Sequence, residues 1–113
     1  MRKIKPEELT LLKCLLKAHI DDFPTLSELL VVDKDDGGMG SLLIVDTNRE
    51  GFNNRIYGST YCQKQFLDDD GVKVLVSLEL DDKGSLFELD IWKTNFDRLK
   101  KYPTTCEELI NFE

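Results

Sequence analysis

The chain has 113 residues, of which 33% are charged and 41% are hydrophobic, and its formal net charge is −7 at pH 7. This length fits one domain, residues 1–113, with a single core, and the composition argues against disorder. The acidic balance argues against binding nucleic acid through phosphates, but it allows a basic protein partner or a metal cation. Acidity that only aids solubility is an equally good explanation.

The first predicted element is a helix from Pro6 to about Ile20. Proline suits the first turn of a helix, and Glu7 and Glu8 suit its positive end. The apolar residues cover a wide arc, which favours burial against a sheet, with contact to a partner chain as the alternative. These apolar residues are Leu9, Leu11, Leu12, Cys14, Leu15, Leu16, Ala18 and Ile20.

Three strands are predicted in the middle of the chain. Thr25 and Glu28 have the spacing of a capping box, so a short helical turn precedes a strand at residues 29–32. Residues 41–45 are apolar on both faces, which indicates a central strand. A polar loop at residues 47–54 leads to a third strand at residues 55–66.

The clearest signal is a β-hairpin formed by residues 72–80 and 86–92, with Asp82-Lys83-Gly84 in the connection. Alternation of side chains places one set on the core face: Val72, Val74, Val76, Leu78 and Leu80 with Phe87, Leu89 and Ile91. A two-residue loop sets Leu80 beside Phe87, Leu78 beside Leu89 and Val76 beside Ile91. A four-residue loop shifts the pairing by two residues and keeps the same faces.

The predicted fold class is α+β: an antiparallel β-meander of about five strands with one long N-terminal helix packed on one face and a short C-terminal helix. The C-terminal helix is predicted from the capping-box spacing of Thr105 and Glu108. One long helix covers one face of the sheet only. We therefore expect the other face to be at least partly open.

The residues expected on that open face are the candidate site. They are Glu79, Glu88, Asp90 and Trp92. Acidic side chains around an aromatic anchor are typical of protein interfaces, which predicts a non-enzymatic protein-binding module with a basic partner. The alternative is a small-ligand-binding protein or a hydrolase that uses Glu79, Glu88 and Asp90, since crowded carboxylates can have a raised pKa. A deep pocket touching two of these acids favours the alternative, and a broad, shallow acidic face favours the module.

Other patterns for cofactor or metal binding fail on their spacing. The acidic segment that begins at Asp33 has Gly37 and Ile44 where a calcium loop needs ligands. The glycine-rich residues 37–41 lack the lysine of a phosphate-binding loop and precede a strand. The only histidine, His19, has no neighbour that indicates catalysis. The sequence therefore predicts no cofactor, no metal site and no catalytic residue.

The expected location is the cytoplasm. No segment is long and apolar enough to span a membrane, and the basic residues 1–5 do not precede the apolar stretch of a secretory signal. Cys14, Cys62 and Cys106 are far apart and show no ligand spacing, so we expect them to be reduced and largely buried.

Three runs carry a resemblance to known proteins: residues 36–42 (DGGMGSL), 68–72 (DDDGV) and 86–93 (LFELDIWK), followed by Phe96. Through them the chain resembles, from about Leu9 to Pro103, a family of small bacterial single-domain proteins of unknown function. Such proteins are similar in size and acidity to immunity proteins of polymorphic toxin systems. The resemblance implies an intracellular protein that binds and neutralises a toxin, and it transfers no catalytic residue. Neither the residues nor the resemblance specifies the partner or the oligomeric state.

Overall fold

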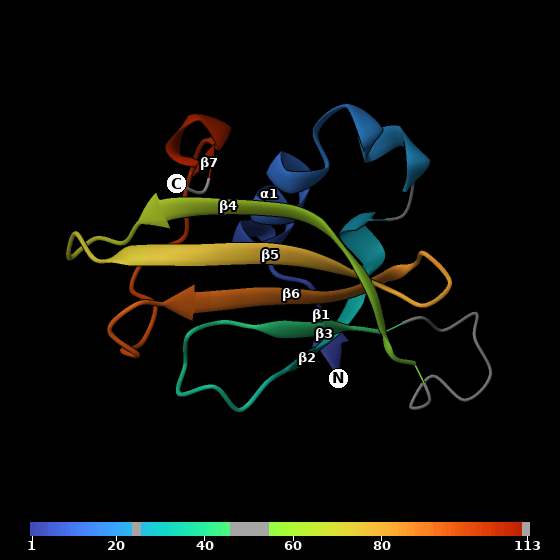
Figure 1. The fold of residues 1–113 in the computed structure, drawn as a ribbon, viewed down its shortest axis with the longest axis horizontal. Coiled ribbons are helices and arrows are strands. Elements are labelled where there is room, and N and C mark those ends of the chain that lie inside the picture. The colour runs from blue at the N-terminus through green and yellow to red at the C-terminus, as the bar shows by residue number, and fades with distance from the viewer. Residues whose placement is uncertain (24–25, 46–54, 112–113) are drawn as a thin grey trace.

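A computed structural model describes residues 1–23, 26–45 and 55–111. Its strands all pair antiparallel in one seven-stranded sheet of order β1-β2-β3-β6-β5-β4-β7, with helix α1 behind the sheet in Figure 1. The elements are β1 (Arg2–Lys3), α1 (Pro6–Leu16), β2 (Leu30–Asp33), β3 (Leu42–Ile44), β4 (Tyr57–Leu67), β5 (Lys73–Asp81), β6 (Leu86–Lys93) and β7 (Ile110–Asn111). The described residues also form the short 3-10 helices η1 (Lys17–Asp22), η2 (Leu26–Glu28) and η4 (Cys106–Glu108).

This architecture corrects the predicted five-stranded meander. Strand β3 pairs with β6 and not with β4, so the strand order departs from the chain order. The two outermost strands, β1 and β7, have two residues each, which is too short for an alternating pattern to reveal. Thr25 and the loop predicted at residues 47–54 lie outside the described residues.

Both predicted helices are shorter than expected. Helix α1 has 11 residues and ends at Leu16, because Lys17 adopts a φ of 51° and the chain continues as the 3-10 helix η1. The predicted C-terminal helix is the single turn η4. Thr105 and Glu108 form the capping box as predicted, but the chain then becomes extended at Leu109 and pairs as β7.

The core lies between α1 and the sheet. Val76, Leu78, Leu89 and Ile91 are at most 1% exposed, which confirms the predicted core face of the hairpin. The pairs Val76–Ile91 and Leu78–Leu89 also match the prediction.

The predicted pairing of Leu80 with Phe87 is wrong. A register shift between Glu79 and Leu80 pairs Leu80 with Leu86. Leu86 therefore enters the core, while Phe87 is only half-buried and lies under the guanidinium of Arg55, 5.1 Å from its ring centroid.

A buried ion pair joins the start of β4 to the hairpin turn. Arg55 and Asp81 have side chains that are 2% and 0% exposed, and their charged groups lie 2.9 Å apart. Arg55 also donates hydrogen bonds to the carbonyl oxygens of Ile44, at 2.6 Å, and Leu86. Burial by itself would raise the pKa of Asp81, but the amide of Ser85 and the charge of Arg55 outweigh it and hold the pKa at about 2.

A second buried ion pair fixes the far end of the hairpin. Lys93, at the end of β6, is fully buried and lies 2.9 Å from Asp68 and 2.6 Å from Asp70. Asp68 also accepts hydrogen bonds from the backbone amides of Lys100 and Lys101, which ties the segment after β6 to the β4–β5 turn. Burial would lower the pKa of Lys93, but its two carboxylate partners raise it overall.

Two of the three cysteines, which were predicted to be reduced, are oxidised, and Cys62 is reduced as predicted. Cys14 of α1 and Cys106 of η4 form a disulfide across 92 residues of sequence, and Cys62 on β4 is a half-buried free thiol. Sequence spacing does not reveal this pair, because the packing of the C-terminal segment against α1 brings the two residues together. Among the residues the structure describes, no helix is long and apolar enough to cross a membrane.

Candidate functional site

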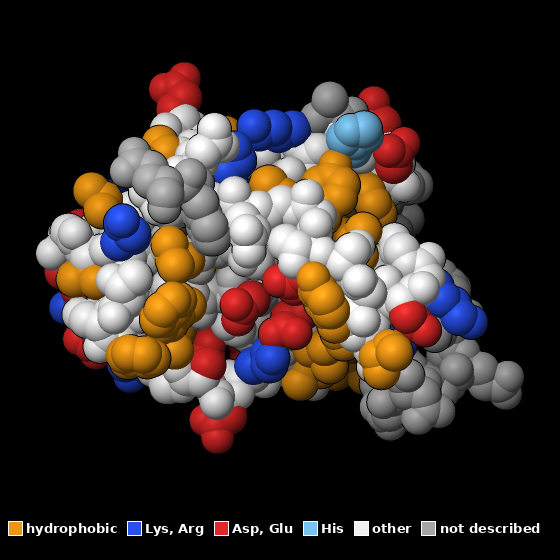
Figure 2. Space-filling model, viewed as in Figure 1, with side chains coloured by type: hydrophobic (Ala, Val, Ile, Leu, Met, Phe, Trp, Pro, Cys, Tyr) orange, Lys and Arg blue, Asp and Glu red, His pale blue; other side chains and the backbone are white. Residues whose placement is uncertain are grey.

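The candidate site is the face of the sheet opposite α1. On this face Glu79 of β5 lies directly across from Glu88 of β6, and Leu75 lies across from Trp92. Figure 2 views this face and shows acidic side chains gathered at its middle, with hydrophobic side chains on both sides of them. The four residues predicted from the sequence are therefore placed on one face by two adjacent strands.

Three carboxylates, Glu79, Glu88 and Asp90, form the centre of this face, and a lysine pairs with one of them. Glu88 is only 17% exposed in its side chain and forms an ion pair with Lys34, which follows β2. Glu79 accepts a 2.7 Å hydrogen bond from the hydroxyl of Thr60 on β4. Like charges directly opposite each other on neighbouring strands destabilise a sheet, so this Glu79–Glu88 pair opposes folding rather than supporting it.

Asp90 has the most perturbed electrostatics of the three acids. Partial desolvation raises the pKa of its carboxyl, and the charge of Glu88 raises it further. The charge of Lys34 and a hydrogen bond from the hydroxyl of Ser41, at 3.5 Å, oppose this rise without cancelling it. A second cation beside Asp90 would stabilise the ionised carboxylate and lower its pKa. This face therefore favours the approach of a basic group.

An aromatic pair flanks the acids. Trp92 is 40% exposed and Phe96 is 69% exposed, and their ring centroids are 5.8 Å apart. Phe96 has a φ of 63°, in the left-handed region that non-glycine residues seldom occupy. Its amide donates a 2.8 Å hydrogen bond to the carbonyl oxygen of Lys93, so the turn that follows β6 holds it there. The turn thus keeps a large apolar side chain in solvent beside Trp92.

Three residues of this face were not predicted from the sequence: Lys34, Thr60 and Phe96. Lys34 is 54 residues away from Glu88 in sequence, and no local pattern connects the two. Phe96 follows the runs that carry the family resemblance. No residue typical of turns, such as glycine, indicates a left-handed backbone conformation at this position.

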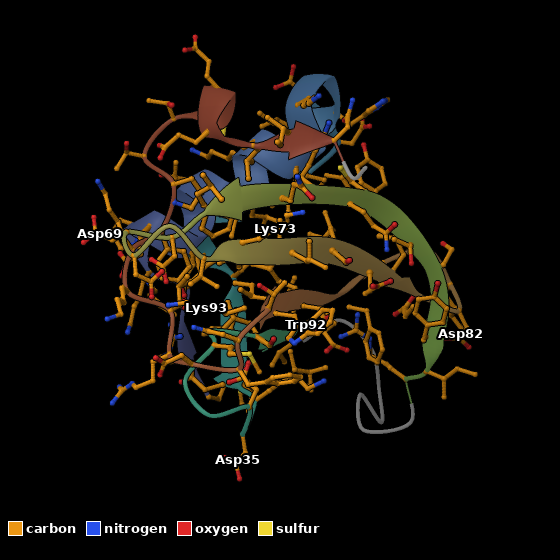
Figure 3. The ribbon with its side chains drawn as sticks, turned by 60° about the vertical axis from the view of Figure 1, so that its left-hand side comes forward. Asp35, Asp69, Lys73, Asp82, Trp92 and Lys93 are labelled. Carbon is orange, nitrogen blue, oxygen red and sulfur yellow. A yellow bond between two sulfur atoms is a disulfide. The ribbon has the colours of Figure 1, made fainter. Side chains whose placement is uncertain are left out.

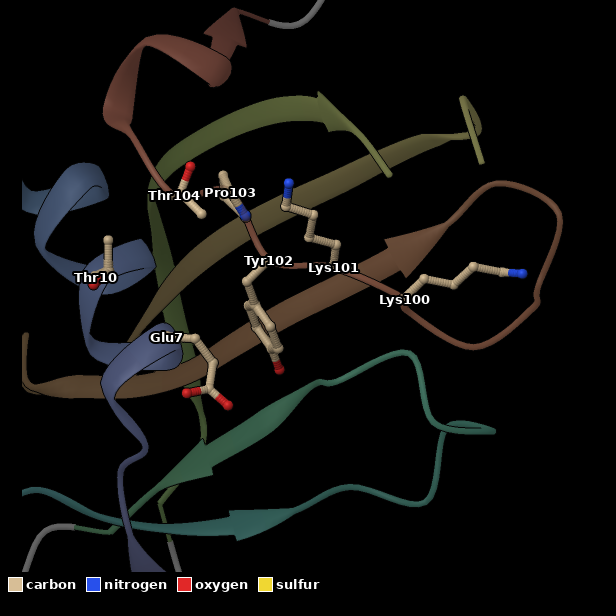
Figure 4. A pocket seen from close by; sticks show the side chains of 7 residues that line it. All are labelled: Glu7, Thr10, Lys100, Lys101, Tyr102, Pro103 and Thr104. Carbon is tan, nitrogen blue, oxygen red and sulfur yellow. The ribbon is translucent and has the colours of Figure 1, made fainter. Parts of the chain in front are cut away.

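Two cavities are lined by described residues, and none of the four candidate residues lines either of them. One, of about 430 Å³, lies between α1 and the segment after β6 and is shown in Figure 4. The other, of about 320 Å³, lies between β4 and the C-terminal segment. Within the described ranges, no group of three or more histidine, cysteine, aspartate or glutamate side chains is arranged to hold a metal ion.

The fold and this face define a small antiparallel α+β protein with one helix-covered and one open sheet face. The family described as "Domain of unknown function (DUF6984)" matches residues 1–103, and the chain belongs to this family. No curated protein and no solved structure matches the chain. The family description assigns no activity, so it gives no residue of the open face a role.

Proposed function

We propose that this protein is a non-enzymatic binding module whose open sheet face binds a basic protein. The observation that carries the proposal is the exposed Trp92–Phe96 pair beside three carboxylates, of which only Glu88 forms an ion pair among the described residues, with Lys34. A few residues carry most of the binding energy of a protein interface, and tryptophan is among the residues most enriched in that role. The excess negative charge increases the rate of encounter with a basic partner.

We propose further that the partner is a toxin that this protein neutralises in the cytoplasm, as an immunity protein does. The support for this finer step is the chain's small size, its net charge of −7 and the sequence resemblance. The Cys14–Cys106 disulfide counts against a permanently reducing compartment, because cytoplasmic thiols are kept reduced. A cytoplasmic protein would therefore hold these two cysteines as thiols.

The alternative function is that of a hydrolase or a small-ligand-binding protein that uses the same three carboxylates. Such chemistry needs a concave site that excludes water around two of the acids. Neither the cavity beside α1 nor the cavity beside β4 is lined by Glu79, Glu88 or Asp90.

The test is capture of a partner from the source organism, followed by measurement of its association rate. The Glu88→Lys/Asp90→Lys variant reverses the charge at the middle of the open face. The matched control is Asp35→Lys/Asp69→Lys, which makes the same change in net charge at two side chains that project into solvent in Figure 3. Circular dichroism checks that both variants fold.

The proposal predicts that the face variant associates about tenfold or more slowly at low salt, and that the difference shrinks at high salt. The control variant should associate at close to the wild-type rate. Equal association rates for both variants would place the binding surface elsewhere. Unfolding of the face variant alone would show that the acids are structural groups.

A further inference from the structure

The C-terminal strap, defined here as residues 104–111, has few contacts with the other described residues. Its strand β7 pairs with β4 at Lys64 and Gln65, and the side chain of Asn111 accepts a hydrogen bond from Lys64. The residues of the strap are exposed except for Leu109, which is half-buried against the core. The Cys14–Cys106 disulfide is the one covalent link between the strap and α1.

Two cavities lined by described residues border this strap. The cavity of about 320 Å³ lies under it, between Glu108 and Ile110 of the strap and Phe66, Leu67 and Lys73 of the sheet. The cavity of about 430 Å³ lies where the strap leaves the body of the protein and is lined in part by Thr104 (Figure 4). A segment with this little packed surface has low local stability once its covalent link is removed.

The strap also lies outside the part of the chain that matches the family, residues 1–103. Those residues contain Cys14 and every strand except β7, whereas Cys106 belongs to the strap. The disulfide therefore attaches an additional segment to the shared fold.

The strap covers the part of the β4 edge that is suited to strand pairing. The first half of β4 has register shifts between Tyr57 and Ser59 and between Thr60 and Cys62, and such bulges protect an edge from pairing. From Cys62 to Leu67 the pairing with β5 is regular, and β7 pairs with the outer side of this stretch at Lys64 and Gln65. At the opposite edge of the sheet, Arg2 of β1 is held in ion pairs with Glu8 and Asp33.

We propose that the disulfide is a redox latch: its reduction releases the strap, and the exposed edge of β4 pairs antiparallel with the same edge of a second copy. The second copy is the favoured occupant because residues 62–67 contain one lysine and no carboxylate, in a chain of net charge −7. Two acidic chains can therefore meet at this edge without opposed carboxylates. In a dimer with a twofold axis, each copy pairs its β4 edge with the β4 edge of the other copy. Neither copy then has a free β4 edge, so the assembly stops at two chains.

The reductant is a dithiol, and thiol–disulfide exchange accounts for the chemistry. Its thiolate attacks Sγ of Cys106, which belongs to an exposed residue, and displaces Cys14 as a thiolate that takes up a proton. The second thiol of the reductant then closes a cyclic disulfide and releases Cys106 as a thiol. Two electrons pass from the dithiol to the protein, and two cysteine thiols form.

The test compares the full chain before and after treatment with dithiothreitol, by light scattering for mass and by hydrogen exchange for protection. The proposal predicts a monomer when oxidised and a doubled mass when reduced. Amides of residues 110–111 should exchange at least tenfold faster after reduction, while those of residues 62–67 stay protected in the dimer. The Cys14→Ala/Cys106→Ser variant should behave like the reduced protein without any reductant.

Cys62→Ala is the matched control, because it removes the free thiol and keeps the latch. It should be monomeric when oxidised and dimeric when reduced, like the wild type. A reduced protein that stays monomeric, or whose residues 110–111 stay protected, would overturn the proposal. So would a dimer that forms only when Cys62 is present, because an intermolecular disulfide would then explain it.

Discussion

Replacing Arg55 with methionine tests how much the buried ion pair between the start of β4 and the β5–β6 turn stabilises the fold. Methionine keeps an apolar stem against Phe87 but removes the cation that faces Asp81 at 2.9 Å. It also removes the donors to the carbonyl oxygens of Ile44 and Leu86. Loss of one partner from a buried ion pair costs about 3–5 kcal/mol. Asp81 retains the amide hydrogen bonds of the turn, so we expect a loss near the lower end, about 3 kcal/mol.

The assay is urea denaturation of wild type and Arg55→Met at neutral pH and again in acid. The native pKa of Asp81, about 2, lies below its ordinary value of 3.8, so its ionised form stabilises the fold above pH 3.8. That stabilisation is lost as the pH falls through about 2, so the difference between the two proteins should shrink there. Arg98→Met, at an exposed arginine, is the control and should change stability by less than about 0.5 kcal/mol. A loss from Arg55→Met below about 1 kcal/mol, or one that does not depend on pH, would refute this account of the ion pair.

Three further predictions concern the core, the open face and the latch. Leu78→Ala should destabilise the protein by about 2–5 kcal/mol in chemical denaturation, because Leu78 is fully buried, and a loss under about 0.5 kcal/mol would contradict its core position. Glu88→Gln should lower the pKa of Asp90, followed by NMR titration of its carboxyl carbon, and an unchanged pKa would show that Glu88 does not act on it. Reduction of Cys14–Cys106 should lower the free energy of unfolding by about 2–4 kcal/mol, and identical melting curves with and without reductant would contradict that.

The hairpin was predictable from the sequence because alternation of side chains is a local property. Val76 and Leu78 on one strand and Leu89 and Ile91 on the next needed only period-two patterning and a turn signal. The register shift after Glu79 depends on how the turn closes and not on hydrophobicity, so the pattern misassigned the residues next to the turn.

The strand order and the disulfide were not predictable in the same way. The pairing of β3 with β6 and the contact of Cys14 with Cys106 join segments that are distant in sequence. Tertiary packing decides such contacts, and a single sequence carries no local signal for them. The two-residue strands β1 and β7 are likewise defined by their partners and not by their own residues.

The candidate site was predictable from the sequence only in part. Alternation places Glu79, Glu88, Asp90 and Trp92 on one face, and the structure brings them together on adjacent strands. Lys34, which forms the ion pair with Glu88, and the exposed Phe96 lie outside the hairpin's own strands. Sequence reasoning therefore located the face but not its full set of charges and aromatic rings.

Trp92 offers the most direct test of the proposal that the open face binds a protein, because it is the only tryptophan in the chain and lies on that face. The measurement is acrylamide quenching of its fluorescence, with the captured partner prepared as a tryptophan-free variant. Trp92 is 40% exposed in the free protein, so the account predicts substantial quenching that falls sharply when the partner is bound. Quenching that stays the same in the complex would show that the partner leaves this face uncovered, and would contradict the proposal.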